Sequence, residues 1–156
     1  MNQIPSNAVS PQAKGRVLLI EDDDALAGLL ARVLRTDGYQ VDTFESGELL
    51  PPAAKLTGYD VVLTDVHLGG KATGHDVLKR VREASPTMPV ILMTAYADIE
   101  GAMNAVSQGA YDYLAKPIEP TELRRMLGEA ITRRRLSESK KPAPDARETA
   151  ASDAQI

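Results

Sequence analysis

The chain has 156 residues, of which 43 % are hydrophobic and 26 % charged, with a net charge of −4 at pH 7. That length favours one domain of an ordinary globular protein, and the negative charge gives no reason to expect direct binding of nucleic acid. The absence of cysteine excludes disulfide bonds, and no apolar run approaches the roughly 20 residues needed to cross a bilayer, so we expect a cytoplasmic protein with no membrane contact.

Both ends of the chain are polar and show no periodicity. Residues 1–15 are interrupted by prolines, serines and a glycine, and residues 137–156 mix charges with alanine and proline. Segments of this kind bury too little apolar surface to offset the entropy lost on ordering. We therefore predict a disordered leader over residues 1–15, one folded domain over residues 16–136, and a flexible tail over residues 137–156.

Short β-rich runs alternate with helical patterns through the predicted domain. The first run is continuously apolar, as in a strand that is buried on both faces. Strands are predicted at residues 17–20, 39–44, 61–64, 90–93 and 111–115. Apolar residues at helical spacing follow each of these runs, with Asp98 as the N-cap of the fourth helix and Pro120 in the first turn of the last one. The second helix contains Pro51 and Pro52, so we expect it to be short or to begin at Pro51.

Alternating strands and helices predict the class and topology of the fold. A strand followed by a helix, five times over, gives a parallel sheet with helices on both faces. Because crossovers are right-handed, we predict a doubly wound α/β fold with a five-stranded parallel sheet, strand order 2-1-3-4-5, of the flavodoxin-like type.

Ligands bind such sheets beyond the carboxyl ends of the strands. Glu21 and Asp22 follow the first strand, Asp65 ends the third, Thr94 ends the fourth and Lys116 ends the fifth. We expect all of these side chains to meet at one edge of the sheet. The neighbouring Asp23 and Asp24 are either solvated or cap the first helix.

The chemistry of that edge depends on its charge. Two carboxylates about 4 Å apart repel by about 4 kcal/mol at an effective dielectric constant near 20, so a bare acidic cluster is unfavourable. A hard divalent cation relieves the repulsion, and with oxygen ligands alone Mg²⁺ is the natural ion. One carboxylate can then act as a nucleophile towards a phosphoryl group, while Lys116 and Thr94 donate hydrogen bonds to its oxygens.

Four segments of the chain, LLIEDDDALAGLL, VVLTDVHL, PVILMTAYAD and GAYDYLAKPI, resemble the signature blocks of response-regulator receiver domains. The resemblance covers about residues 15 to 135. It implies that Asp65 is the phosphoacceptor, that Asp22 ligates the metal directly, and that Glu21 does so through water. The backbone carbonyl of His67 would be a further ligand.

The resemblance also implies a switching role for three residues. Thr94 corresponds to the switch hydroxyl, Lys116 to the phosphate-binding lysine, and Tyr113 to the switch aromatic, although a tyrosine on a short edge strand can equally be ordinary half-buried packing. Receiver domains take their phosphoryl group from a sensor histidine kinase or phosphotransfer protein, and they catalyse only their own phosphorylation and dephosphorylation. We expect a downstream protein or output domain as partner, and a homodimer can form through the fourth helix, the fifth strand and the last helix.

The chain departs from the family pattern beside the site. Glu21 stands where aspartate is more usual, and the loop after Asp65 has Gly69 in place of proline and is one residue longer before Gly74. Adjacent glycines would loosen the backbone that offers the carbonyl ligand.

Three other functions fit the chain less well. One is a phosphorylation-independent interaction module of the same fold, and the presence of every site residue disfavours it. A Mg²⁺-dependent phosphatase would need a second acid where His67 stands. A flavin-binding protein would need a phosphate-binding loop after the first strand. We expect the side chains of His67 and His75 to be surface residues, and residues 133–135 to be a solvated helix end.

Overall fold

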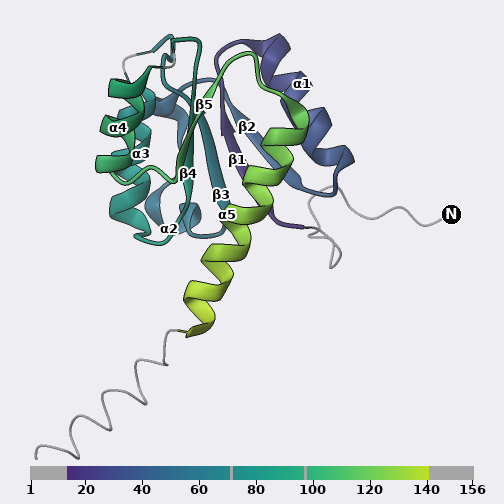
Figure 1. Ribbon diagram of the computed structural model, residues 1–156, viewed down its shortest axis with the longest axis vertical. Coiled ribbons are helices and arrows are strands. Elements are labelled where there is room, and N and C mark those ends of the chain that lie inside the picture. Colours follow the sequence, from purple (N-terminus) through teal and green to yellow (C-terminus); the bar gives the residue numbers. More distant parts are fainter. Residues whose placement is uncertain (1–13, 71, 97, 141–156) are drawn as a thin grey trace, which may run out of the picture.

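The computed structural model describes residues 14–70, 72–96 and 98–140. Five strands form one parallel sheet in the order β2-β1-β3-β4-β5 (Figure 1). The strands are β1 (Arg16–Ile20), β2 (Gln40–Phe44), β3 (Val61–Asp65), β4 (Val90–Thr94) and β5 (Asp112–Ala115). Both the parallel direction and the strand order confirm the predicted doubly wound fold.

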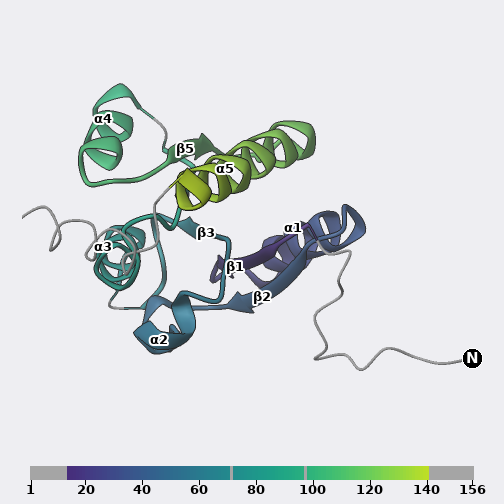
Figure 2. The same cartoon turned by 90° about the horizontal axis from the view of Figure 1, so that it is seen from below.

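Helices cover both faces of this sheet. They are α1 (Asp24–Thr36), the 3₁₀ turn η1 (Gly47–Leu49), α2 (Ala53–Leu56), α3 (Gly74–Ala84), α4 (Ile99–Ser107) and α5 (Pro120–Lys140). Figure 2 shows α1 and α5 on one face and α2, α3 and α4 on the other. Within the described part of the chain, no helix is both long and apolar enough to cross a membrane.

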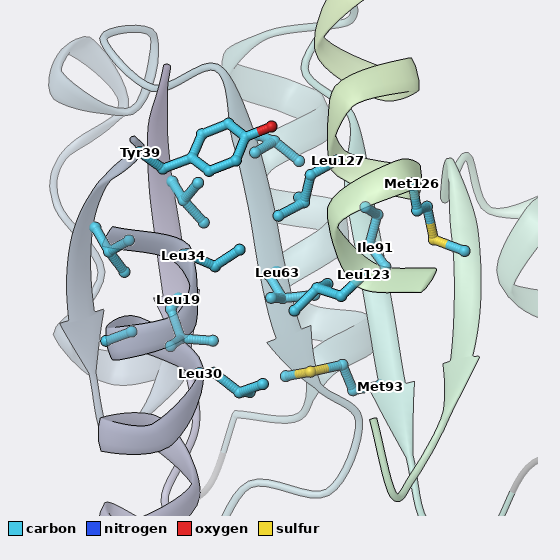
Figure 3. Close-up of a cluster of buried hydrophobic side chains, with 14 of the residues drawn as sticks. Leu19, Leu30, Leu34, Tyr39, Leu63, Ile91, Met93, Leu123, Met126 and Leu127 are labelled. Carbon is cyan, nitrogen blue, oxygen red and sulfur yellow. The ribbon is translucent and has the colours of Figure 1, made fainter. Parts of the chain in front are cut away.

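The two faces of the sheet carry separate hydrophobic cores. Adjacent residues of a strand point to opposite faces, so Leu19 packs under α1 and α5 while Leu18 packs under the other helices. The core beneath α1 and α5 also contains Leu34, Leu63 and Leu127 (Figure 3). This burial on both sides explains why the strands read as continuous apolar runs, and it holds their carboxyl ends rigidly together.

The helix between β2 and β3 is short, as the prolines predict. Ser46 precedes the 3₁₀ turn but makes no side-chain capping hydrogen bond. The helix α2 begins after Pro52, which is its N-cap residue and has φ −60°. The fixed φ of proline suits a position just before a first helical turn and is unfavourable inside a helix.

The folded part begins before the boundary that we predicted. Lys14 lies in the segment assigned to the leader, yet its backbone N–H donates to the Gly38 carbonyl at 3.0 Å. Its ammonium group pairs with Asp37 at 3.2 Å. These contacts tie residue 14 to the turn that follows α1. The rest of the predicted leader, residues 1–13, lies outside the described residues.

The last helix extends past the boundary predicted at residue 136. It runs to Lys140, so the predicted tail is wrong over residues 137–140. The extension is stabilised because Arg134 pairs with Glu138 at 3.2 Å, and because the Thr87 hydroxyl donates to the same carboxylate at 3.2 Å. Residues 141–156 of the predicted tail lie outside the described residues.

Candidate functional site

Three acidic residues converge at the carboxyl ends of β1 and β3. Glu21 and Asp22 follow β1, Asp65 ends β3, and these two strands are neighbours in the sheet. One carboxylate oxygen from each residue lies within 4.8 Å of the other two. Glu21 and Asp65 are buried, whereas Asp22 is exposed. The predicted convergence of these residues is confirmed, and the exposed member leaves the cluster open to solvent.

Lys116 neutralises part of this cluster directly. It follows β5, and its ammonium nitrogen lies 2.8 Å from Glu21 Oε1 and 2.8 Å from Asp65 Oδ2. The lysine side chain is itself 18 % exposed. The acidic cluster of the metal-free protein is therefore compensated only in part, because one ammonium group faces three carboxylates. Buried carboxylates are tolerated when they are paired, and one lysine here serves two of them.

The shared ion pair shifts the ionisation of its members. Burial raises the pKa of Glu21 above its ordinary value, and hydrogen bonds from Lys116 and from the Asp23 backbone only partly oppose that shift. The charge of Asp65 adds to the raised pKa of Glu21. Burial alone would lower the pKa of Lys116, but its hydrogen bonds to Asp65 and Glu21 outweigh burial and raise it. Lys116 is therefore a cation at neutral pH.

The carboxylate of Asp65 is held through both oxygens. Oδ2 accepts from Lys116, and Oδ1 accepts from the backbone N–H of His67 at 3.1 Å. The start of α3 presses against this strand end, since a Cβ at Gly74 would lie 2.3 Å from the Asp65 carbonyl oxygen. Only glycine fits there without moving the backbone beneath the carboxylate.

Thr94 and Tyr113 lie on the adjacent strands. Thr94 is buried, and its hydroxyl accepts a hydrogen bond from the backbone N–H of Tyr96 at 3.0 Å. Tyr113 is half-buried against the core beneath α3 and α4. Its hydroxyl reaches α4, where a Cβ at Gly101 would lie 2.8 Å from the phenolic oxygen. The ring of Tyr113 therefore lies between β5 and the helix α4.

The loop after Asp65 is anchored by Glu48, a residue that the sequence did not predict to take part. Glu48, in the 3₁₀ turn, accepts a hydrogen bond from the backbone N–H of Ala72 at 2.6 Å. The backbone of Gly69 also approaches the acidic cluster, since a Cβ there would lie 3.0 Å from Asp22 Oδ2. The adjacent glycines thus allow a close approach to Asp22, and Glu48 limits the looseness that we expected. No motif in the sequence points to Glu48.

The structure also shows the surroundings of Asp23 and of the two histidines. Asp23 is the N-cap of α1 and accepts from the Leu26 N–H at 3.1 Å, so it stabilises that helix. His67 is exposed, and its ring meets that of Tyr96 edge to face, with 5.6 Å between centroids. His75 is half-buried and contacts Gln108, so it is less exposed than we expected.

The donor set suits a hard divalent cation. Three carboxylates and the neighbouring backbone offer only oxygen ligands, which Mg²⁺ prefers. Both oxygens of Glu21 are already engaged, Oε1 by Lys116 and Oε2 by the Asp23 N–H at 3.1 Å. Both oxygens of Asp65 are engaged as well, by Lys116 and by the His67 N–H. The exposed Asp22 is therefore the most accessible direct ligand of the three.

Comparison with known proteins identifies the family. Residues 17–128 match the model of the response regulator receiver domain. The chain is 38 % identical over 120 residues to the DNA-binding transcriptional regulator NtrC of Escherichia coli K12. The aligned region covers 76 % of this chain and 25 % of that protein. It is 39 % identical over 108 residues to the response regulator protein FleR of Pseudomonas aeruginosa, covering 69 % of this chain and 23 % of that protein. The chain thus spans about a quarter of the length of these curated relatives.

A solved structure agrees with the sequence matches. A response regulator receiver domain protein from Clostridium thermocellum superposes with a TM-score of 0.72 at 31 % identity, covering 78 % of this chain and 97 % of that one. The fold and the arrangement of acids and lysine define a signalling receiver domain. The chain belongs to the response regulator receiver domain family of two-component systems, whose role is switching by phosphorylation.

Proposed function

We propose that Asp65 accepts a phosphoryl group from the phosphohistidine of a sensor histidine kinase or phosphotransfer protein. The observation that carries the proposal is the placement of its carboxylate, buried at the end of β3 with Oδ2 bonded to Lys116 at 2.8 Å and two further acids beside it. An ordinary structural carboxylate would need the lysine alone. The surplus of negative charge fits a cation-assisted reaction at this point.

Residues beside Asp65 can assist the steps of the proposed transfer. An oxygen of Asp65 attacks the phosphorus, the bond to the donor histidine nitrogen breaks, and that nitrogen keeps the electron pair. Lys116 can leave Asp65 for a phosphoryl oxygen without losing its bond to Glu21. Thr94 accepts a hydrogen bond from Tyr96, so its own hydroxyl hydrogen is free to donate to a second oxygen.

Mg²⁺ would be held by Asp22, Asp65 and the backbone carbonyl of His67, with Glu21 acting through water. When bound, it supplies positive charge that offsets the charge on the phosphoryl oxygens. Glu21 has a second task that needs no metal, because its carboxylate keeps Lys116 at the site after Asp65 has reacted.

The consequence of phosphorylation is a change of partner binding. Movement of Thr94 towards the phosphoryl group would alter the space available to Tyr113, and thereby the face formed by α4, β5 and α5. That face already carries exposed apolar side chains on or beside α4, namely Tyr96, Ile99, Met103 and Val106. A downstream protein or output domain, or a second copy of the chain in a homodimer, would bind there. We propose that the domain acts in the cytoplasm and catalyses only its own phosphorylation and dephosphorylation.

The proposal is tested with acetyl phosphate as a small phosphodonor. The wild type should gain one acid-labile phosphoryl group in Mg²⁺ and none in EDTA, and Asp65→Asn should gain none. No labelling of the wild type would contradict the proposal and favour a phosphorylation-independent interaction module of the same fold.

The metal ligands are tested by calorimetry with a matched pair of substitutions. Asp22→Asn should weaken Mg²⁺ binding at least about tenfold, because it removes a full charge next to the ion. Asp23→Asn should leave the affinity nearly unchanged, because asparagine caps α1 as well as aspartate does. Equal losses in the two variants would contradict the assignment of Asp22.

A further inference from the structure

The helix α4 is held unevenly along its length. Of its residues only Ala105, in its C-terminal half, is buried. Ile99 and Met103, towards the N-terminal end, are 80 % and 68 % exposed. Figure 2 shows α4 at the margin of its layer, beside β5 and α3. Few buried apolar contacts mean that the N-terminal half of this helix is the part that moves at low cost.

A single arginine ties down the other end of α4. The guanidinium of Arg82, near the end of α3, donates to four backbone carbonyls. The acceptors are Ser85 at 3.4 Å, Pro86 at 2.6 Å, Met88 at 2.7 Å and Gly109 at 3.0 Å. The first three belong to the connection between α3 and β4, whereas Gly109 lies in the turn between α4 and β5 and has φ 99°. Arg82 therefore joins the turn after α4 to the connection that precedes β4.

A second contact reinforces this tether. Nδ1 of His75, at the start of α3, lies 3.0 Å from Oε1 of Gln108, which is the C-cap residue of α4. His75, Gln108 and Arg82 also line a cleft of about 420 Å³ along α3, together with Leu78 and Lys79. The C-terminal end of α4 is thus bridged to α3 through Gln108 and Gly109.

The free end of α4 is the end that faces the candidate site. It follows the segment in which Thr94 bonds to the Tyr96 N–H, and Gly101 of α4 lies against the Tyr113 hydroxyl. A change at Thr94 or Tyr113 therefore acts on the unanchored end, while Arg82 holds the opposite one.

We propose that Arg82 is the positioning residue of this switch. It fixes the C-terminal end of α4, so that phosphorylation swings the N-terminal end of the helix about residues 108 and 109. The direction of the swing rests on the proposed function of Asp65, whereas the tether is a property of the unphosphorylated domain. The two parts can therefore be tested separately.

The tether is tested by amide hydrogen exchange in the unphosphorylated protein, using Arg82→Lys. Lysine keeps the positive charge, but a single ammonium group cannot span four carbonyls. Exchange at Gln108, Gly109 and Ala110 should become about fivefold faster, the factor that corresponds to the loss of one hydrogen bond of average strength. The matched control is Arg80→Lys on the same helix, because Arg80 donates to Pro51 and not to α4. Unchanged exchange in Arg82→Lys, or equal effects of both variants, would overturn the tether.

The swing is tested by spin-label distances, which a merely structural arginine would not affect in this way. The chain contains no cysteine, so labels can be placed at will. Leu29→Cys on α1, on the opposite face of the sheet, serves as the reference and is paired with Ile99→Cys or with Val106→Cys. Phosphorylation should change the Leu29–Ile99 distance clearly and the Leu29–Val106 distance little.

Arg82→Lys should remove that difference between the two ends, His75→Ala should reduce it, and Arg80→Lys should leave it unchanged. Equal shifts at both ends in the otherwise wild-type protein would overturn the pivot, as would no shift in protein shown to be phosphorylated. Failure to phosphorylate at all would contradict the proposed function instead, and the exchange experiment would still decide whether Arg82 holds α4.

Discussion

The two ends of the sheet manage buried charge in opposite ways. At the carboxyl ends of the strands, Lys116 is shared between two buried acids, Glu21 and Asp65. At the amino ends, arginines bind mainly backbone carbonyls. Arg82 donates to four carbonyls, and Arg134 donates to the carbonyl of Tyr59, just before β3, in addition to its ion pair with Glu138. The energy of an ion pair changes when another ion binds beside it or when its acid takes up a proton, whereas the energy of an arginine bound to backbone carbonyls changes little. The carboxyl ends of the strands are therefore the reactive end of the domain, and the amino ends fix its helices.

The largest expected effect on stability is that of Lys116→Met, which removes the cation shared by the two buried acids. Glu21 and Asp65 would then be buried without a cation, which should cost about 3–5 kcal/mol of unfolding free energy at pH 7. Urea denaturation in EDTA measures it, and the exposed Lys79→Met on α3 serves as control, with a change within about 0.5 kcal/mol. A loss for Lys116→Met no larger than that of the control would mean that the shared ion pair contributes nothing.

A smaller effect is expected at the amino ends of the strands. Arg134→Met removes the donor to the Tyr59 carbonyl and the pair with Glu138, and should cost about 1–2 kcal/mol. Because the main acceptor is uncharged, this loss should be the same at pH 5 and pH 7 and should not respond to Mg²⁺. The same urea titrations at both pH values measure it. A loss that depends on pH as strongly as that of Lys116→Met would remove the distinction between the two ends.

The smallest expected effect is the pH dependence of the stability that Glu21 contributes. Folding raises the pKa of Glu21, chiefly through burial, so the folded protein binds that proton more tightly than the unfolded chain does. The contribution of Glu21 to stability should therefore rise as the pH falls from 7 towards the ordinary glutamate value. Glu21→Gln lacks this gain, so its stability relative to wild type should decrease over the same range. Denaturation series in EDTA test the sign, and a difference that stays constant with pH would contradict it.

Much of this arrangement was predictable because topology decides where strand ends meet. Once Glu21, Asp22, Asp65 and Lys116 were assigned to strand ends of one parallel sheet, their convergence followed. The ion pairs of Lys116 with two acids were not predictable, since they depend on the path of a flexible side chain across three strands.

Other features of the fold carry local signals in the chain. The extension of α5 past residue 136 is supported by Arg134 and Glu138, four residues apart. The capping box of α3, in which Thr73 and Asp76 each bond to the other's backbone, has the spacing expected of a helix start. Glu48 carries no such signal, because its contact with Ala72 joins segments that are distant in sequence.

The central claim is that one carboxylate, that of Asp65, forms the phosphoryl bond. Its most direct test is to phosphorylate the wild-type chain with acetyl phosphate and Mg²⁺, reduce the aspartyl phosphate with borohydride, and locate the modified residue by peptide mass spectrometry. We predict that modification is found at residue 65 alone and that Lys116→Met reduces it strongly. Modification at Glu21 or Asp22, or an unmodified Asp65 in protein that carries phosphate, would contradict the claim.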